Sequence, residues 1–204
     1  MNRFDMAAKE WDSKPTSLLV AQTTSEKIKE IIDLTHKSLL DYGCGTGLLA
    51  FAISDDASSV LGMDNSIGMI EVFNQKAQEF GFDNIKAIQH NIDTQSLPHQ
   101  AFDVIVTSMT LHHIQNPDSF FKKCTEALKP DGYLCISDLD EEDGTFHAKH
   151  NNDGVHHFGF SKENIQKFYE NNGYKLIYLD DICTLERENG NFPIFLSIGQ
   201  INKG

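Results

Sequence analysis

Residues 39–49 constrain the fold more than any other part of the chain. They read LLDYGCGTGLL: an apolar run, the acid Asp41, a glycine at every second position from Gly43 to Gly47, and a second apolar run. Glycine lets the backbone turn tightly and approach a ligand without a Cβ in the way. Such crowding at the carboxyl end of a strand is typical of a nucleotide-like cofactor site, so we predict a strand, a cofactor-binding turn and a helix. A turn that serves only helix–strand packing is the alternative.

The glycine spacing separates two classes of cofactor. Dinucleotide-binding proteins use G-x-G-x-x-G, whereas this chain has Leu48 where the third glycine of that pattern would stand, which disfavours a nicotinamide or flavin oxidoreductase. Asp64 lies 17 residues past Gly47, at the end of the next apolar run. An acid there can accept hydrogen bonds from both hydroxyls of a ribose. Capping of the following helix by residues 64–66 is the alternative.

Short β-rich runs alternate with helical runs along the rest of the chain, which predicts parallel βαβ units in a single α/β domain. A capping box at Thr23–Glu26 is expected to open the first long helix. We expect an N-terminal helical segment (1–37), a cofactor-binding half (38–138) and a substrate-side loop with C-terminal strands (139–204). Strands are expected over residues 38–42, 59–63, 85–89, 102–108, 133–137, 174–179 and 195–201. The intervening helices are expected over 48–53, 67–80, 116–128 and 161–173.

Composition narrows the partners. The 204 residues carry 17 Lys and Arg against 30 Asp and Glu, a formal net charge of -13, and no basic run offsets it. Nucleic acid and anionic membranes attract basic proteins, so we expect neither as a partner. No segment resembles a signal peptide, and no apolar run reaches the roughly 20 residues of a membrane span. Four scattered cysteines are typical of reduced thiols, so we expect a cytoplasmic protein.

Five segments resemble, in order, the motifs of one enzyme family. They are residues 41–47, Asp93 before Leu97 and Pro98, residues 102–106 with 111–114, residues 128–134 and residues 192–196. With these motifs the chain resembles the class I S-adenosylmethionine-dependent methyltransferases, of the small-molecule kind that includes the ubiquinone and menaquinone enzymes. The resemblance covers residue 39 to about residue 200.

The resemblance implies a doubly wound, Rossmann-like α/β fold with helices on both faces of a mostly parallel, seven-stranded sheet. Its seventh strand would lie antiparallel between the fifth and the sixth. The implied function is methyl transfer from S-adenosylmethionine by in-line displacement to a small molecule, in a monomer or homodimer. A non-catalytic protein that binds the cofactor as a sensor or scaffold stays open. The expected cofactor contacts are Trp11, Asp41, Gly43, Cys44, Gly45, Gly47, Asp64, Asn65, Met69, Asp93, Thr94 and Thr107.

The catalytic residues are less constrained, because a sulfonium cofactor already carries an activated methyl group. A general base is needed only if the acceptor holds a proton at neutral pH. The candidates are His112, which follows the fourth strand, and His156 and His157 in the long loop 139–160. Because that loop also holds His147, His150 and three phenylalanines, we expect a lid over the substrate. A solvated loop is one alternative. Metal binding by the histidines of residues 147–157 is another, which we do not favour because a mobile polar loop rarely fixes ligand geometry, so no residue is assigned as a metal ligand.

Overall fold

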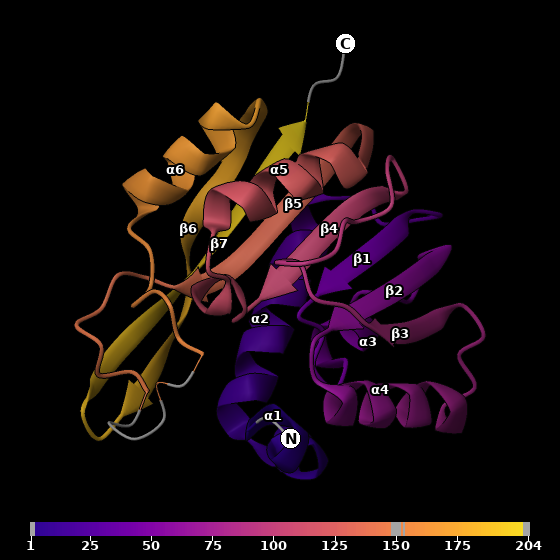
Figure 1. Ribbon diagram of the computed structural model, residues 1–204, viewed down its shortest axis with the longest axis horizontal. Helices are drawn as coiled ribbons and strands as arrows, with labels where there is room; N and C mark the ends of the chain where they lie inside the picture. The colour runs from indigo at the N-terminus through magenta and orange to yellow at the C-terminus, as the bar shows by residue number, and fades with distance from the viewer. Residues whose placement is uncertain (1–2, 148–151, 153, 202–204) are drawn as a thin grey trace.

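The computed structural model describes residues 3–147, 152 and 154–201, in which helices and strands alternate as the sequence predicts (Figure 1). The N-terminal segment holds α1 (Arg3–Ala7), η1 (Ala8–Ser13) and α2 (Pro15–Ile31). The strands are β1 (Ser38–Tyr42), β2 (Ser59–Asp64), β3 (Ile85–Gln89), β4 (Phe102–Ser108), β5 (Leu128–Leu139), β6 (Tyr174–Arg187) and β7 (Gly190–Ile201). The remaining helices are α3 (Leu48–Ala52), α4 (Ile67–Glu79), η2 (Leu111–His113), α5 (Pro117–Ala127) and α6 (Lys162–Asn171).

The seven strands form one sheet in the order β3-β2-β1-β4-β5-β7-β6. The first five strands pair in parallel, and β7 pairs antiparallel with both β5 and β6. The expected antiparallel strand between the fifth and the sixth is therefore confirmed. Parallel strands end at one edge of the sheet, so the turns after β1, β2 and β4 lie close together.

Helices cover both faces of the sheet, as a doubly wound fold requires. On one face, α2, α3 and α4 pack against the strands through side chains such as Ile28, Leu49 and Phe73. On the other face, α5 and α6 contribute Phe121 and Tyr169 to a second buried cluster, and Figure 1 shows α5 in front of β4 and β5. Strands covered on both sides are continuously apolar, and Val104, Ile105 and Val106 are accordingly fully buried.

The predicted helix start at Thr23 is wrong. Residues 23–26 lie inside α2, which begins at Pro15, a residue suited to the first turn because it has no amide hydrogen to leave unbonded. The Thr23 hydroxyl donates to the Leu19 carbonyl one turn earlier at 2.9 Å. The Thr24 hydroxyl is buried and donates to Ser137 in β5 at 3.0 Å. Both hydroxyls are thus satisfied within a continuous helix, so neither needs to cap one.

The last two strands are longer than the sequence suggests. Pairing of β6 with β7 continues from Tyr174–Ile201 to Arg187–Gly190, across two register shifts. The outer half of this hairpin carries Leu185 and Arg187 to the edge of the sheet where the turns after β1 and β4 lie. The loop after β5 runs beside it, and Phe146 packs on Phe192 with ring centroids 5.2 Å apart. None of the described helices is long and apolar enough to span a membrane.

Candidate active site

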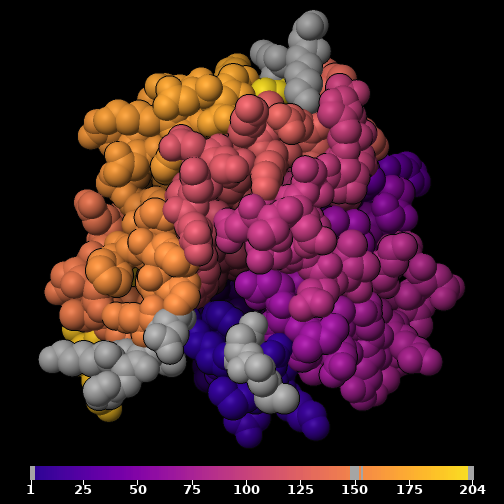
Figure 2. Space-filling model, viewed as in Figure 1, coloured from indigo at the N-terminus to yellow at the C-terminus, as the bar shows by residue number. Residues whose placement is uncertain are grey.

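A cavity of about 480 Å³ opens at the carboxyl ends of β1, β2 and β4, where the fold predicts a ligand. Its wall comes from the glycine turn, the ends of β2 and β4, the N-terminal helices, the loop after β5, and β6. Figure 2 shows the N-terminal segment lying between the C-terminal half of the chain and the β2–α4 region. The predicted site residues that line the cavity are Trp11, Asp41, Gly43, Cys44, Gly45, Asp64, Asn65, Met69, Asp93 and His112.

The backbone of the glycine turn lines the cavity, and Gly45 and Gly47 lack a side chain for different structural reasons. Gly45 has a φ of +52°, and a Cβ added there would lie 3.9 Å from the nearest Met69 and Trp11 atoms, so the space belongs to the cavity. Gly47 has a φ of +92°, and a Cβ there would lie 2.6 to 2.8 Å from the rings of Phe51 and Phe73. Gly45 therefore leaves room for a ligand, whereas Gly47 is needed for packing and does not line the wall.

Asp64 fastens the glycine turn to the start of α4. One carboxylate oxygen accepts the Gly45 amide at 2.9 Å and the other accepts the Ser66 amide at 2.8 Å. The helix cap itself is Ser66, whose hydroxyl accepts the Met69 amide. Of residues 64–66, Ser66 is therefore the one that caps the helix, and Asp64 lines the cavity wall. Burial raises the pKa of Asp64, and the amides of Ser66 and Gly45 partly oppose that shift.

Two aspartates of the N-terminal segment, Asp5 and Asp12, attach that segment to the start and the body of α4 beside the cavity. Asp5 accepts hydrogen bonds from the Ser66 hydroxyl at 2.6 Å and from the Gly68 amide at 3.1 Å. Asp12 pairs with Lys76 of α4 at 2.6 Å. These contacts hold the segment that carries Trp11, and Trp11 lines the cavity; its contact with the cofactor stays a prediction.

Histidines form the opposite end of the cavity. The turn η2 after β4 supplies His112 and His113, and the loop after β5 supplies His147. Nδ1 of His112 lies 2.6 Å from a carboxylate oxygen of Asp138, and both side chains are fully buried. Burial alone would raise the pKa of Asp138, but His112 and the amides of Leu139 and His112 lower it, so the carboxylate is ionised.

The other two imidazoles are neutral near pH 7. Burial and the neighbouring His112 lower the pKa of His113 to about 3. Burial, His112 and the charges of two arginines lower the pKa of His147 to about 4. Nδ1 of His113 lies 2.7 Å from the Gly154 carbonyl oxygen, so this nitrogen is the one turned toward that carbonyl.

Of the described residues in the loop 139–160, only two lie at the cavity, and the predicted lid stays a prediction. Phe146 and His147 line the cavity, but Phe158 is half exposed and Phe160 packs in the core. His156 and His157 do not line the cavity. Their amides donate to the carbonyl of His112, which bends the loop against η2. The ring of His157 lies against Phe160, and its Nε2 lies 3.0 Å from the Ile114 carbonyl oxygen. His150 lies outside the described residues.

Two predicted cofactor contacts also lie away from the wall. Thr107 is buried in β4 beside Ile136, and the cavity begins with the residues that follow, Ser108 to Thr110. Thr94 is exposed in the turn that follows Asp93. A strand's last residue is hard to place from sequence, and an error of one position turns a side chain from the cavity into the sheet.

Arg187 was not among the predicted site residues. It lies on β6, about 140 residues from the glycine turn, and reaches the cavity because the β6–β7 hairpin extends past the sheet. Its guanidinium donates to the Phe146 carbonyl at 2.6 Å and lies 3.8 Å from the centroid of the Phe146 ring. No local motif marks this position.

Comparison with known proteins agrees with this geometry. A family model described as a methyltransferase domain matches residues 34–173, more than half of the chain. This chain belongs to the class I S-adenosylmethionine-dependent methyltransferase family. The methyltransferase is 30% identical over 148 residues to a ubiquinone biosynthesis O-methyltransferase of Histophilus somni, covering 68% of this chain and 62% of that protein. It is 32% identical over 148 residues to the Actinobacillus pleuropneumoniae enzyme of the same name, covering 68% and 63%. The chain thus spans less than two thirds of the length of these relatives.

Solved structures share the fold of the methyltransferase. A SAM-dependent methyltransferase of Aquifex aeolicus superposes with a TM-score of 0.74 at 19% identity, covering 97% of this chain and 98% of that one. A putative methyltransferase of Haloferax volcanii, solved with the Trm112 activator, gives a TM-score of 0.81 at 14% identity, covering 99% of each chain. Identities this low establish the fold alone.

The cavity of the methyltransferase fits S-adenosylmethionine at the Asp41 and Asp64 end. Asp41 is buried in the cavity wall, and its Oδ2 has no hydrogen-bond partner within the described residues. Burial, and then the charge of Asp64, raise the pKa of Asp41 to about 7. A buried carboxylate without a partner is costly, and a cation beside it restores the ionised form. S-adenosylmethionine carries an ammonium and a sulfonium, whose charges suit this carboxylate.

Proposed function

We propose that this methyltransferase transfers the methyl group of S-adenosylmethionine to an oxygen atom of a small molecule bound at the histidine end of the cavity. The observation that carries the proposal is one continuous cavity. It joins the glycine turn, Asp41 and Asp64 to His112, His113 and His147. A cofactor held by the glycine turn, Asp41 and Asp64 directs its sulfonium into the cavity. The acceptor then binds at the end formed by the histidines.

The protein contributes to this reaction mainly by positioning the acceptor in line with the methyl group. The acceptor's lone pair forms a bond to the methyl carbon while the carbon–sulfur bond breaks and its electron pair stays on sulfur. Holding the two reactants in line can lower the barrier by several kcal/mol, up to about 7–11 in good models. Trp11 and Phe146 line the cavity and give part of its wall an apolar, aromatic surface.

Two further observations support a small molecule, and oxygen as its accepting atom. The formal charge of -13 opposes nucleic acid as the acceptor. The curated relatives are named O-methyltransferases of ubiquinone biosynthesis, which makes oxygen the accepting atom we expect. The four free cysteines, three of them buried, suit a reducing compartment such as the cytoplasm.

The test follows a labelled methyl group. The purified protein is incubated with methyl-labelled S-adenosylmethionine and, in separate reactions, the small-molecule and macromolecular fractions of a cell extract. We expect label in the small-molecule fraction, together with an equal amount of S-adenosylhomocysteine. Label in RNA or protein would contradict the proposed substrate class. Tight cofactor binding with no transfer to any fraction would instead favour a sensor or scaffold.

A further inference from the structure

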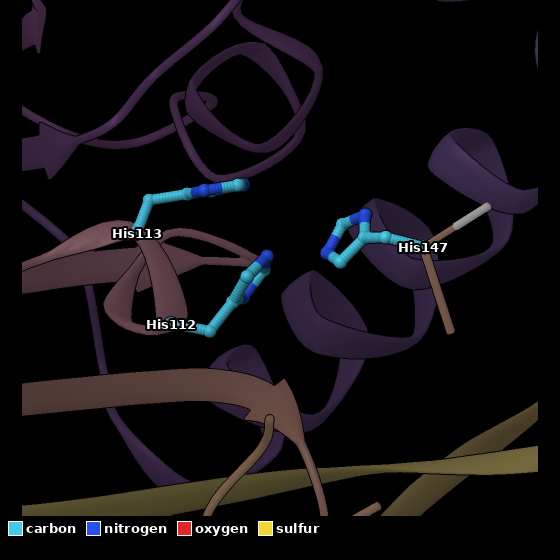
Figure 3. Close-up of side chains that lie close together, drawn as sticks. All are labelled: His112, His113 and His147. Carbon is cyan, nitrogen blue, oxygen red and sulfur yellow. The ribbon is translucent and has the colours of Figure 1, made fainter. Parts of the chain in front are cut away.

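Three imidazoles from two separate segments converge at the substrate end of the cavity. Figure 3 shows the rings of His112 and His113, from η2, and of His147, from the loop after β5, around one small space. One nitrogen from each ring lies within 4.8 Å of the other two. Since the segments are far apart in sequence, the fold itself assembles this cluster.

Hydrogen bonds on the far side of two rings fix which nitrogen faces the space. Nδ1 of His112 is bonded to the carboxylate of Asp138 at 2.6 Å, and Nδ1 of His113 to the Gly154 carbonyl at 2.7 Å. Both partners are acceptors, so each Nδ1 donates its hydrogen and Nε2 is the nitrogen of each ring that is left to bind a metal. Nε2 of His112 and Nε2 of His147 are buried and have no hydrogen-bond partner within the described part of the chain.

We propose that His112, His113 and His147 bind a divalent transition metal ion, with zinc preferred, through their Nε2 atoms. Three histidines with a fourth position open to a cavity are a ligand set that zinc uses in catalytic sites. A histidine that binds a metal almost always donates its other N–H to a carboxylate or a carbonyl. His112 has the Asp138 carboxylate as this partner, and His113 has the Gly154 carbonyl.

The geometry needs only a small adjustment. Zinc–nitrogen bonds of about 2.0–2.1 Å in a tetrahedron place ligand nitrogens roughly 3.4 Å apart. The present separations of at most 4.8 Å close to that value through side-chain rotation, which the half-buried His113 and His147 permit. Arg3 and Arg187 line the same cavity and their charge opposes a cation, while the Asp138 carboxyl group lies on the far side of His112, 2.6 Å from its Nδ1.

The role of the metal rests on the proposed function. A hydroxyl of the acceptor occupies the open position, and the metal lowers its pKa, so the proton leaves to solvent water. The metal-bound oxygen then supplies the electron pair that forms the bond to the methyl carbon. S-adenosylhomocysteine and the methylated oxygen are the products.

Binding of the metal is tested without turnover. The full chain is stripped with a chelator, and zinc alone is titrated by calorimetry and in competition with a chromophoric chelator. Cobalt(II) is added in parallel, because four-coordinate cobalt absorbs visible light strongly. We expect one zinc per chain and a four-coordinate cobalt spectrum. The variants are His113→Ala and His147→Ala, with His99→Ala, at an exposed position outside the cavity, as the matched control.

The proposal predicts a different zinc affinity for the site variants than for the control. His113→Ala and His147→Ala should each weaken zinc binding at least 100-fold, Asp138→Asn should weaken it about 10–100-fold, and His99→Ala should leave it unchanged. Unchanged melting temperature and cofactor affinity show that a variant is folded. No stoichiometric zinc in the wild type, or equal affinity in all four variants, would overturn the proposal. Zinc bound as expected, with no methyl transfer to any acceptor, would count against the proposed function only.

Discussion

The pH dependence of cofactor binding follows from Asp41. Its pKa is raised to about 7 in the unbound protein, so the carboxyl is largely protonated below that pH. A cationic cofactor binds the ionised form, so affinity falls as pH falls through 7. Each unit below the pKa costs about tenfold, or about 1.4 kcal/mol. Between pH 7 and pH 5 the dissociation constant for S-adenosylmethionine should rise about 50-fold, about 2.3 kcal/mol.

Calorimetry at half-unit steps from pH 5 to 7.5 measures this effect. Asp41→Asn should bind the cofactor weakly at every pH and lose most of the pH dependence. Asp93→Asn, which changes another carboxylate of the wall, should keep that dependence. Adenosine has no charged methionine half, so its affinity should not follow the titration of Asp41. A flat wild-type profile, or the same slope in Asp41→Asn, would refute the reasoning.

The raised pKa of Asp41 also predicts how the free energy of unfolding changes with pH. A raised pKa means that the folded, unbound protein holds a proton that the unfolded chain releases. Its contribution to the free energy of unfolding is therefore present below the ordinary pKa near 3.8 and is lost as pH rises to about 7. Urea denaturation of the unbound protein at pH 5 and pH 7 gives an independent check. The Asp41→Asn variant should lose less stability over that range.

Three further outcomes are expected. Gly47→Ala should lower the free energy of unfolding by about 2–3 kcal/mol in urea denaturation, because the added Cβ would meet two phenylalanine rings at a residue with a positive φ. Gly45→Ala should instead fold and bind the cofactor more weakly, as measured by calorimetry. Trp11 is the only tryptophan and lines the cavity, so cofactor binding should change the intrinsic fluorescence, and an unchanged spectrum at saturation would argue against its position. His147→Ala should reduce turnover tenfold or more, about 1.4 kcal/mol, with cofactor affinity retained, while His156→Ala should stay near wild type in the same steady-state assay.

The cofactor end of the site could be predicted because its residues are local in sequence. The glycine turn and Asp64 each lie at the carboxyl end of a strand, and a parallel sheet brings those ends together without any knowledge of side-chain packing. The glycine turn and Asp64 are therefore visible from their order alone. Buried strands such as β4 are equally visible, since they are apolar on both faces.

The substrate end could not be predicted in the same way. His147 and Arg187 reach the cavity through packing of the loop after β5 against the β6–β7 hairpin. The β6 strand lies at the edge of the sheet and is mostly exposed, so hydrophobic periodicity does not mark its length. His156 and His157 share the composition of a site but are held against η2 by their backbone amides. Clustering of histidines in sequence thus failed to identify which ones face the cavity.

A structure of the protein with S-adenosylhomocysteine bound tests the central claim most directly. The account predicts ribose hydroxyls at Asp64, the methionine ammonium beside Asp41, and the sulfur atom facing the end of the cavity formed by His112, His113 and His147. The position where the transferable methyl group projects from sulfur would then point at the space left for the acceptor. A ligand bound elsewhere, or one whose sulfur faces away from the histidines, would contradict the account.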